Sequence, residues 1–436
     1  MKVEPWLPRA AAAHPRQVAL ETAAGRVTYD ELARRAELAA YGLAASGVSS
    51  GDRVALALPA GVDFAVALHA CLRLGAVAVP LHERLTARER AAQSAGAALV
   101  LEELPQADPI APADLAGRHD PDAPAIVVHT SGTRGAPAPV ALTYANWEAS
   151  ARGSAAALGH DPDERWLCAL PLAHVGGLSI LLRCAIHATT AVLHERFDTA
   201  RVLHALRDER ITLVSLVPTM LRRLLDSGLD HPPALRCALI GGAPLPLELA
   251  RRAREVGVPL AQTYGLAEAC SQVTVSAIGE PETAGRPLPG TSVQIGADGE
   301  ILVAGATVAT AALGADGLLH TADLGTLDES GRLTVVGRRS EMIVSGGENV
   351  APAEVEAVLL EHRAVADAGV FGRPDAEWGE RVVAAVVLRP GDNTAPPNLR
   401  EHCAERLAGF KVPKEFVLLS ELPRTASGKL LRRRLA

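Results

Sequence analysis

The spacing of apolar residues along the first 240 positions predicts helices that alternate with short strands. Residues 28–44 carry apolar side chains at helical intervals, and Thr28 and Asp30 are typical of a helix start. A second helix is predicted at 63–74, and short Val-, Ile- and Leu-rich runs predict strands at 53–59, 76–80, 98–102, 125–129, 166–170, 190–193, 212–217 and 237–240. Such alternation is typical of parallel sheets covered by helices.

The pattern changes at about residues 285–290, where short apolar runs separated by glycine-containing turns predict a β-rich subdomain that extends to residue 339. We interpret residues 339–341 as a linker. Beyond it, the spacing predicts helices at 352–361 and 398–407 and strands at 366–371, 381–388 and 415–419. This last segment is an α+β unit of a size that is typical of an independent domain.

Length and composition agree with more than one packed domain. A chain of 436 residues is too long for one ordinary core, and its hydrophobic content of 48% supplies a large interior. Aromatic residues make up only 3%, so the core must be aliphatic. The net charge of −7 argues against a nucleic-acid-binding surface, and the short run Arg432-Arg433-Arg434 is interpreted as a solvated helix end.

Cysteine and histidine usage favours a reduced cytoplasmic protein. The six cysteines form no CxxC pair, and the 14 histidines show no paired metal-ligand spacing. The first 17 residues contain no continuous apolar core of a secretory signal, and no apolar run reaches membrane-spanning length.

A loop of small hydroxyl residues and glycines, Thr130-Ser131-Gly132-Thr133-Arg134-Gly135, directly follows the predicted strand 125–129. Backbone N–H groups and hydroxyls of such a loop can surround phosphate oxygens. Because the loop lacks the GxxxxGK[ST] spacing, it is not a Walker loop. An ordinary Ser/Gly turn is the alternative interpretation of this segment taken alone.

Further polar motifs follow in order along the chain. In residues 262–268, Tyr264 beside Gly265 can lie against a base, and Glu268 offers a hard oxygen ligand for Mg²⁺. Asp323 and Arg338 are suitable partners for a ribose diol. The double glycine Gly346-Gly347 lets the backbone approach a ligand closely. Each motif alone is weak, because a surface glutamate or a glycine turn is common.

One lysine in the C-terminal run, Lys429, has a chemistry that the abundant arginines lack. Only four of the 43 basic residues are lysines, and this one follows Ser427-Gly428. Lys is a compact charge on a flexible stem, whereas the guanidinium of Arg is a planar fork. A flexible ammonium on a Ser-Gly turn suits a group that reaches a phosphate and then leaves it. A surface lysine retained by chance is the alternative.

Taken together and in this order, the motifs closely resemble the adenylate-forming superfamily of acyl- and aryl-CoA synthetases, adenylation domains and luciferases. The resemblance runs from Val27 to Lys429 and includes the segment Gly51-Asp52-Arg53-Val54. It implies an α/β fold with a large N-terminal domain at 1–339, made of two sheet-and-helix subdomains plus the β-rich subdomain at about 285–339. It also implies a small mobile α+β lid domain at 340–436.

The resemblance implies a reaction in two halves. A carboxylate attacks the α-phosphate of ATP with Mg²⁺ present, which releases pyrophosphate and leaves an acyl-adenylate. A thiol, usually that of coenzyme A, then displaces AMP and forms a thioester. The implied partners are therefore a small carboxylic acid, ATP and coenzyme A, with no nucleic acid and no membrane span; a homo-oligomer stays open.

Residue roles are also implied by the resemblance. Tyr264 would stack on adenine beside the turn Gly241-Gly242-Ala243-Pro244, and Glu268 would bind Mg²⁺. Lys429 would bridge the α-phosphate and the attacking carboxylate, and the small domain would pivot about Ser340 to bring Gly346 and Gly347 to the pantetheine channel. The implied nucleotide-binding residues are Thr130, Ser131, Gly132, Thr133, Arg134, Gly135, Gly242, Ala243, Tyr264, Gly265, Asp323 and Arg338.

The segment Leu170–Ser179 looks most like the o-succinylbenzoate–CoA ligases of menaquinone synthesis, as do the serine at hinge position 340 and the glycine pair at 346–347. In that branch His174 would border the acyl pocket and gate the thiol path.

The substrate carries a second carboxylate, which needs a cation when buried. Arg183 is our candidate for that cation, and Gly265, Ser271 and Thr274 are candidates to line the pocket; a core histidine and an exposed helix arginine are the alternatives for His174 and Arg183.

The chain departs from the pattern of the superfamily at a few positions. Arg134 replaces a threonine and Ala138 replaces a lysine of the phosphate loop, while Ala267 replaces a threonine next to Glu268. We hypothesise that Arg134 supplies part of the lost charge, since a guanidinium fork matches phosphate oxygens.

The alternatives to this function come from two classes. Within the enzymes, another aryl- or acyl-CoA ligase and an adenylation enzyme that loads a carrier protein fit the same motifs. Outside the enzymes, the alternative is a non-catalytic, degenerate adenylate-binding protein, for which Ala138 and Ala267 would be signs of lost activity. The retained Lys429 argues against the degenerate protein.

Overall fold

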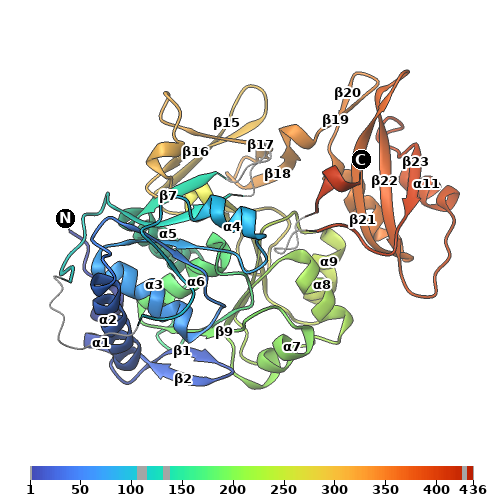
Figure 1. The fold of residues 1–436 in the computed structure, drawn as a ribbon. Coiled ribbons are helices and arrows are strands. Elements are labelled where there is room, and N and C mark those ends of the chain that lie inside the picture. Colours follow the sequence, from blue (N-terminus) through green and yellow to red (C-terminus); the bar gives the residue numbers. More distant parts are fainter. Residues whose placement is uncertain (1, 106–114, 131–137, 425–429, 436) are drawn as a thin grey trace.

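The computed structural model describes residues 2–105, 115–130, 138–424 and 430–435. A large N-terminal part occupies one side of the molecule, and a small C-terminal part, drawn in orange and red, stands beside it (Figure 1). The chain passes between the two parts once, from β18 to β19 (Figure 1).

The most extended sheet has the strand order β14-β13-β12-β11-β10-β8-β9-β1-β2. Its central strands are parallel, as the alternating pattern predicts, whereas β13, β14 and β2 pair antiparallel at the two ends. The strands are β1 (Val18–Thr22), β2 (Gly25–Thr28), β8 (Arg165–Cys168), β9 (Thr190–Leu193), β10 (Leu213–Leu216), β11 (Cys237–Ile240), β12 (Leu260–Leu266), β13 (Ser271–Val275) and β14 (Arg286–Pro287).

A second sheet of the large part has the order β5-β3-β4-β6-β7, in which only the pairing of β6 with β7 is antiparallel. Its strands are β3 (Arg53–Leu56), β4 (Val77–Pro80), β5 (Leu99–Leu101), β6 (Pro124–His129) and β7 (Pro139–Thr143). Because β4 and β6 run parallel, the residues that follow them, His82 and Thr130, leave the sheet at the same edge.

Helices cover the faces of both sheets. The helices of the large part are α1 (Trp6–Ala13), α2 (Tyr29–Ala45), α3 (Val62–Leu74), α4 (Ala87–Gln93), α5 (Tyr144–Leu158), α6 (Val175–His187), α7 (Thr199–Asp208), α8 (Pro218–Asp226) and α9 (Leu247–Glu255). Thr28 caps α2 by accepting a hydrogen bond from the backbone N–H of Glu31. One aliphatic core joins α2, α3, α5 and α6 to the sheets, and a second core lies under α7, α8 and α9.

The β-rich region is an antiparallel meander of β15 (Thr291–Ile295), β16 (Glu300–Gly305), β17 (Leu319–Leu327) and β18 (Leu333–Arg338). Alternate residues of β16 and β17 are buried, which is the period-2 pattern of a sheet with one covered face. Ile301, Val303 and Leu333 belong to its core.

The small C-terminal part has its own sheet and cores. Its strands are β19 (Ile343–Ser345), β20 (Glu348–Val350), β21 (Val365–Asp375), β22 (Gly379–Leu388) and β23 (Glu415–Leu418), and its helices are α10 (Pro352–Glu361) and α11 (Pro396–Ala404). Apolar residues on both faces of β22 are buried, some under α10 and α11 and others under the C-terminal residues. The boundary that we placed at residues 339–340 stays a prediction.

Most predicted elements lie where the sequence pattern put them. The strands at 190–193 and 237–240 and the helix at 352–361 agree residue for residue. Helix α11 begins at Pro396 rather than at 398, because proline at the first positions of a helix needs no N–H partner. The antiparallel end strands were not predicted, since periodicity does not reveal which strand is the neighbour.

One interpretation of the sequence was wrong. Arg432 is not part of a solvated helix end, because its guanidinium forms ion pairs of 2.7 Å with Glu356 and 3.0 Å with Glu341. Its side chain is largely buried, and its Nε donates to the carbonyl oxygen of Val370. Arg432 therefore fastens the C-terminal residues to α10 and to the short 3₁₀ turn Arg339–Glu341.

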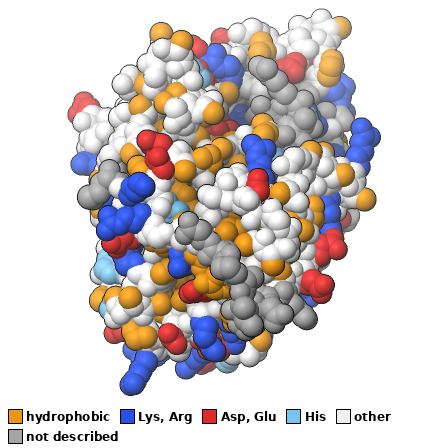
Figure 2. All heavy atoms as spheres, turned by 60° about the vertical axis from the view of Figure 1, so that its left-hand side comes forward, with side chains coloured by type: hydrophobic (Ala, Val, Ile, Leu, Met, Phe, Trp, Pro, Cys, Tyr) orange, Lys and Arg blue, Asp and Glu red, His pale blue; other side chains and the backbone are white. Residues whose placement is uncertain are grey.

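The six cysteines are all free and buried. On the face drawn in Figure 2, basic and acidic side chains are interspersed rather than gathered by sign. Among the helices of the described residues, none has the length and apolar character needed to span a lipid bilayer.

Candidate active site

Three of the predicted nucleotide-binding residues meet around one carboxylate. Asp323 on β17 and Arg338 at the end of β18 are cross-strand partners, and Nε of Arg338 donates to Oδ1 of Asp323 at 2.8 Å. The hydroxyl of Tyr264, at the end of β12, donates to Oδ2 at 2.8 Å. Asp323 is only 6% exposed, so its charge is compensated inside the protein.

The carboxylate of Asp323 keeps acceptor capacity for a ligand. An ionised carboxylate offers about four lone-pair sites, and Tyr264 and Arg338 occupy two of them. Burial, followed by the charge of Asp323, raises the pKa of Tyr264 above its ordinary value, so the phenol stays a neutral donor. The cluster can therefore accept hydrogen bonds from a diol while its aromatic ring offers a stacking face.

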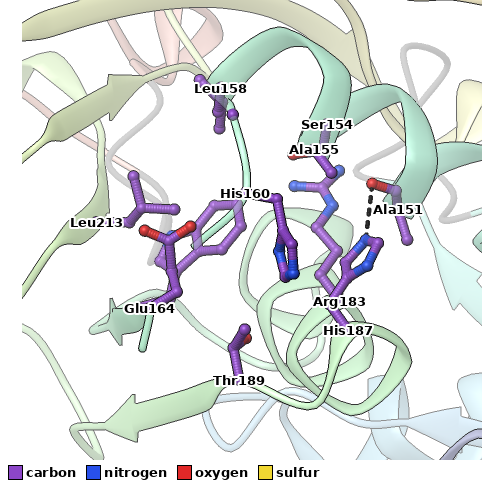
Figure 3. Close-up of a pocket in the computed structure, with 12 residues that line it drawn as sticks. Ala151, Ser154, Ala155, Leu158, His160, Glu164, Arg183, His187, Thr189 and Leu213 are labelled. Carbon is purple, nitrogen blue, oxygen red and sulfur yellow. Dashed lines mark hydrogen bonds between the residues drawn. The ribbon is translucent and has the colours of Figure 1, made fainter. Parts of the chain in front are cut away.

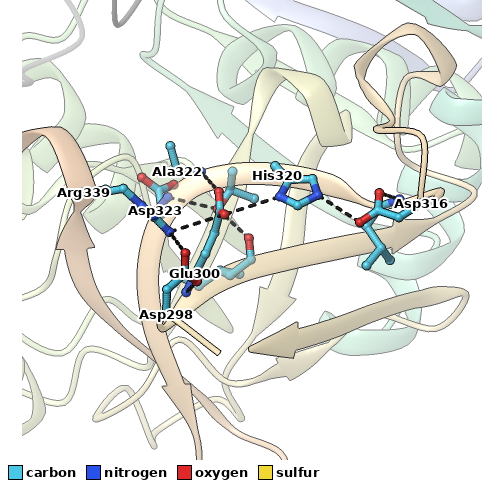
Figure 4. Close-up of polar contacts among 10 residues, drawn as sticks. Asp298, Glu300, Asp316, His320, Ala322, Asp323 and Arg339 are labelled. Atoms are coloured by element: carbon cyan, nitrogen blue, oxygen red, sulfur yellow. Dashed lines mark hydrogen bonds and ion pairs between the residues drawn. The ribbon is translucent and has the colours of Figure 1, made fainter. Parts of the chain in front are cut away.

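A second polar network holds the segment around Asp323 (Figure 4). The backbone N–H of Ala322 donates to Oε1 of Glu300 at 2.8 Å, and Ala322 has a positive φ of 57°. Glu300 also pairs with Arg339 at 3.4 Å, and Arg339 pairs with Asp298 at 2.6 Å. Glu300 thus connects the Asp323 segment to the residue that precedes the predicted hinge Ser340. The sequence analysis missed Glu300, because its role depends on pairing across β16 and β17.

The turn between β12 and β13 requires its glycine. A Cβ on Gly265 would lie 1.7 Å from the carbonyl oxygen of Ser271, so no side chain fits there. Cys270 and Ser271 both have positive φ, of 53° and 92°, and non-glycine residues adopt that region at a cost. The predicted pocket residues Gly265 and Ser271 are thereby held against each other.

Glu268 lies on the 3₁₀ turn Ala267–Ala269, which falls between Gly265 and Ser271 in the sequence. Its backbone carbonyl accepts a hydrogen bond from the N–H of Ala309 at 2.8 Å, which fixes the turn. Within the described part of the chain its carboxylate forms no hydrogen bond or ion pair. A half-buried carboxylate without a protein cation fits a site for a hard metal ion.

The glycine turn after β11 packs against the strand that carries Tyr264. Gly242 has a φ of 78°, and a Cβ on Gly241 would lie 2.9 Å from Cγ2 of Thr263. The turn 241–244 and Tyr264 are therefore neighbours at the carboxyl ends of the parallel strands β11 and β12. In open α/β sheets this edge is where ligands bind.

His174 precedes α6 at the same edge of the sheet and faces a second histidine. The ring centroids of His174 and His82 lie 5.6 Å apart. Burial, and to a lesser extent the charge of His82, lowers the pKa of His174 to about 4, so its imidazole is neutral near pH 7. The sequence analysis missed His82, although its position directly after a buried strand was a signal for it.

Arg183 lines a cavity that contains none of the residues of the Asp323 cluster (Figure 3). The residue is 3% exposed, and its guanidinium donates to the hydroxyl of Ser150 at 3.0 Å and lies 5.6 Å from the ring centroid of Trp166. None of the other predicted site residues lines this cavity, which also contains His160 and His187. A hydrogen bond from Ser150 to the carbonyl of Cys270 is the nearest link to the turn of Glu268.

The buried charge of Arg183 has no carboxylate within ion-pair distance among the described residues. Glu164, which lines the same cavity, pairs instead with Arg236 at 2.6 Å. Burial lowers the pKa of Arg183 to about 10, so it stays charged near pH 7. Thr274 is fully buried, and its hydroxyl donates to the carbonyl of Ala284, which makes it a core residue.

The glycine pair of the small part forms the tip of a hairpin. Ser345 and Glu348 are paired residues of β19 and β20, and Gly346 and Gly347 between them have φ of 63° and 84°. Two consecutive positive φ values are typical of a type I′ turn, which glycine adopts without strain. Ser340 is exposed within the 3₁₀ turn Arg339–Glu341.

Several predicted residues lie outside the described ranges, namely Ser131, Gly132, Thr133, Arg134, Gly135 and Lys429. The ends of the phosphate loop are described: the backbone N–H of Thr130 donates to the carbonyl of Ala138 at 2.9 Å. Arg424 and Leu430, which flank the segment of Lys429, pair with each other on the small part. Arg424 is fastened to β21 by an ion pair of 2.8 Å with Asp367.

Comparison with known proteins gives matches over the whole chain. The model of the AMP-binding enzyme family matches residues 7–311, and that of the AMP-binding enzyme C-terminal domain matches residues 354–429. A 2-succinylbenzoate–CoA ligase of Bacillus subtilis (strain 168) is 39% identical over 472 residues, which cover 99% of this chain and 97% of the relative.

Solved structures of the o-succinylbenzoate CoA synthetase from Bacillus subtilis share the fold. The complex with the acyl-adenylate intermediate OSB-AMP has a TM-score of 0.92 at 38% identity, covering 100% of this chain and 98% of that one. The complex with ATP and magnesium ion has a TM-score of 0.91 at 37% identity, with 100% of both chains covered. A double mutant bound with the product analogue OSB-NCoA gives 0.74 at 38% identity, covering 100% and 98%.

The order of the motifs, the cluster around Asp323 and these full-length matches lead to one assignment. The chain belongs to the AMP-binding enzyme family, with both the large domain and the C-terminal domain of that family present.

Proposed function

We propose that this protein is an o-succinylbenzoate–CoA ligase, which forms an acyl-adenylate from ATP and then the CoA thioester. The observation that carries the proposal is the convergence of Tyr264 with the paired residues Asp323 and Arg338, 59 or more residues further along the chain, on one hydrogen-bonded cluster. The 2-succinylbenzoate–CoA ligase of Bacillus subtilis (strain 168) supports the proposal, since it is 39% identical over nearly the whole chain.

In the first half of the reaction, the Asp323 carboxylate would accept hydrogen bonds from the ribose hydroxyls, with Arg338 holding it in place. Tyr264 would stack on adenine beside Gly242 and Ala243. Thr130 and the residues up to Gly135 that follow the described range would bind the β- and γ-phosphates. Lys429, also outside the described residues, would meet the negative charge that develops at the α-phosphate.

Glu268 would hold Mg²⁺, which supplies charge neutralisation at the phosphates when bound. The proposal is supported by the half-buried carboxylate of Glu268, which forms no hydrogen bond or ion pair among the described residues, and by the solved complex of the Bacillus subtilis enzyme with ATP and magnesium ion. The fixed backbone of the turn, held by Ala309, would keep this carboxylate oriented.

The second half needs another arrangement of the small domain, with Ser340 as the pivot. The exposed turn at 339–341 and the separate cores of the two parts support such a movement. The Bacillus subtilis enzyme with OSB-AMP and its double mutant with OSB-NCoA give TM-scores of 0.92 and 0.74 at equal identity to this chain, which fits a change of domain arrangement. Gly346 and Gly347 would then line the pantetheine path.

His174 would border the acyl pocket as a neutral imidazole, and Gly265 and Ser271 would form part of its wall. Arg183 remains our candidate for the cation that meets the second carboxylate of the substrate. It is a buried charge without a carboxylate partner among the described residues, and the hydroxyl of Ser150 links it to the segment of Ser271.

We propose coenzyme A rather than a carrier protein as the thiol, and a cytoplasmic location. The names of the curated relatives support the first proposal, and six free buried cysteines support the second. A homo-oligomer stays a prediction.

The test is ATP–pyrophosphate exchange across a panel of acids that includes o-succinylbenzoate, followed by addition of coenzyme A and mass detection of the thioester. We expect exchange and thioester formation with the aromatic diacid. Exchange with fatty acids but not with the diacid would overturn the substrate, and binding of nucleotide without exchange for any acid would identify the degenerate adenylate-binding alternative.

A further inference from the structure

A cleft between the large and small domains concentrates arginines from both. It has a volume of about 180 Å³, far more than one water molecule needs. Arg222 on α8 and Arg252 on α9 reach it from the large domain, and Arg363 and Arg389 reach it from the small domain. We name it the interdomain arginine cleft.

Most of this positive charge is not neutralised by the protein. Among the described residues, ion pairing in the cleft is confined to Arg252, which lies 2.7 Å from Asp226, while Arg222, Arg363 and Arg389 form none. Nε of Arg389 donates to the backbone carbonyl of Arg363, so it gains no opposite charge.

The acidic residues of the cleft are already engaged elsewhere. Glu248 pairs with Arg251 at 2.7 Å, and Glu361 lies 3.6 Å from Arg406. Asp367, whose charge acts on Arg222, is fastened to Arg424. These three carboxylates are shared with arginines outside the cleft, so they compensate the arginines of the cleft only in part.

The guanidinium of Arg222 is also partly removed from water. Burial is the largest influence on its pKa and lowers it; the charges of Asp367 and Asp226 raise it, and those of Arg389 and Arg252 lower it. Closing the two domains thus brings like charges together at a site where solvent screens them less than at an open surface. An anion between the two faces would offset that repulsion.

We propose that the interdomain arginine cleft binds a small multivalent phosphate anion, which bridges α8 and α9 to the small domain and stabilises this arrangement of the domains. Guanidinium groups recognise phosphate oxygens through paired, charge-assisted hydrogen bonds. Contributions from both domains make the site complete only when they lie as they do here. The two sources of such a group are free inorganic pyrophosphate and the phosphates of a nucleotide such as coenzyme A.

The first experiment is a binding measurement by calorimetry on the full chain, without turnover. Pyrophosphate and coenzyme A are titrated separately while a non-hydrolysable ATP analogue occupies the nucleotide site. We expect one of them to bind, and to bind at least about tenfold more weakly to the double variant Arg363→Ala/Arg389→Ala, since two charge-assisted contacts are lost. Tighter pyrophosphate identifies the free anion as the source, and tighter coenzyme A identifies the nucleotide.

The matched control is Arg400→Ala, which removes an exposed arginine of the same domain. It should leave binding unchanged, and the charge-keeping variant Arg363→Lys/Arg389→Lys should bind between the wild type and the double alanine variant. Equal affinity in the wild type and the double alanine variant, or no binding of either ligand to the wild type, would overturn the proposal. Because turnover is not measured, a failure of the proposed ligase function has no influence on this result.

A second measurement tests the bridge itself. Tryptic cleavage after Arg339, next to the exposed Ser340, reports how freely the two domains separate. The ligand that binds should slow this cleavage in the wild type and in Arg400→Ala, but not in Arg363→Ala/Arg389→Ala. An equal slowing in the double variant would show that the anion acts at another site.

Discussion

Two arginines of the large domain, the half-buried Arg338 and the buried Arg183, have opposite surroundings. Arg338 donates to Asp323 at 2.8 Å, and the pair shares its carboxylate with Tyr264. Arg183 is buried against Trp166 and Ser150, with no carboxylate within ion-pair distance in the described part of the chain. Removing one partner of a buried ion pair leaves an uncompensated charge, whereas removing an unpaired buried charge leaves none and ends its desolvation cost.

The contrast separates a charge that is matched by a carboxylate from one that, among the described residues, is not. The nucleotide side is organised before ligand arrives, because its charges are matched within the chain. The Arg183 side carries a buried positive charge that no carboxylate of the described residues pairs with. The following changes test whether that second charge is functional or structural.

The largest effect is expected from Lys429→Ala. If the nucleotide side is a reaction centre, removing the ammonium that meets developing charge should lower ATP–pyrophosphate exchange by about 10²–10³-fold. Transfer from a supplied acyl-adenylate to the thiol should be largely intact, which separates the two half-reactions. Equal losses in both half-reactions would contradict the assigned role.

Asp323→Ala would remove the carboxylate that Arg338 and Tyr264 share. Nε of Arg338 and the hydroxyl of Tyr264 would both lose their acceptor, so we expect a loss of about 2 kcal/mol in the free energy of unfolding, measured with denaturant. The KM for ATP should rise roughly tenfold or more. Tyr264→Phe is the matched control, because it removes one donor and should cost only about 1 kcal/mol.

Arg183→Met tests the unpaired side directly. Because no ion pair is lost among the described residues, the melting temperature should stay the same or rise. If Arg183 meets the second carboxylate of the substrate, the KM for o-succinylbenzoate should rise about tenfold or more while that for ATP is unchanged. An unchanged KM for the diacid would leave Arg183 as a buried structural cation.

Arg134→Ala tests whether Arg134 replaces the positive charge that is missing at Ala138, where members of the superfamily have a lysine. We expect the apparent KM for ATP to rise several-fold, since a guanidinium fork on the phosphates would be lost. Arg134→Lys keeps the charge and should be affected less. A value equal to that of the wild type would rule the hypothesis out.

The smallest effect concerns His187, which lines the cavity of Arg183. Burial, together with the charges of His160, Arg183 and Arg9, lowers the pKa of His187 below 6.5, although its hydrogen bond to Ala151 raises it. The neutral ring therefore contributes stability above about pH 6.5, and this is lost as the pH falls and the unfolded chain binds the proton first. In Arg183→Met the pKa, followed by NMR, should move upward; no movement would mean that the two groups do not face each other.

Much of the site was predictable because its motifs are local. The glycines at 346–347 predict a tight turn by themselves, and Asp323 and Arg338 lie 15 residues apart on strands joined by one hairpin. His82 and Glu300 were missed, since their roles come from contacts with residues that are distant in sequence. The solvated end predicted for Arg432 was wrong for the same reason, because Glu341 and Glu356 are supplied by other parts of the chain.

The sequence by itself determined the alternation of helices and strands, the order of the motifs and the chemical groups available for nucleotide, metal and acid. These features depend on periodicity and on residue type, which can both be read from a single sequence. Only the tertiary structure decided which charges are matched. It pairs Arg338 with Asp323, leaves Arg183 beside Trp166, and gathers Arg222, Arg363 and Arg389 in one cleft. Pairing and burial are set by packing between distant segments, and the energy of a charge depends on those surroundings rather than on its place in the sequence.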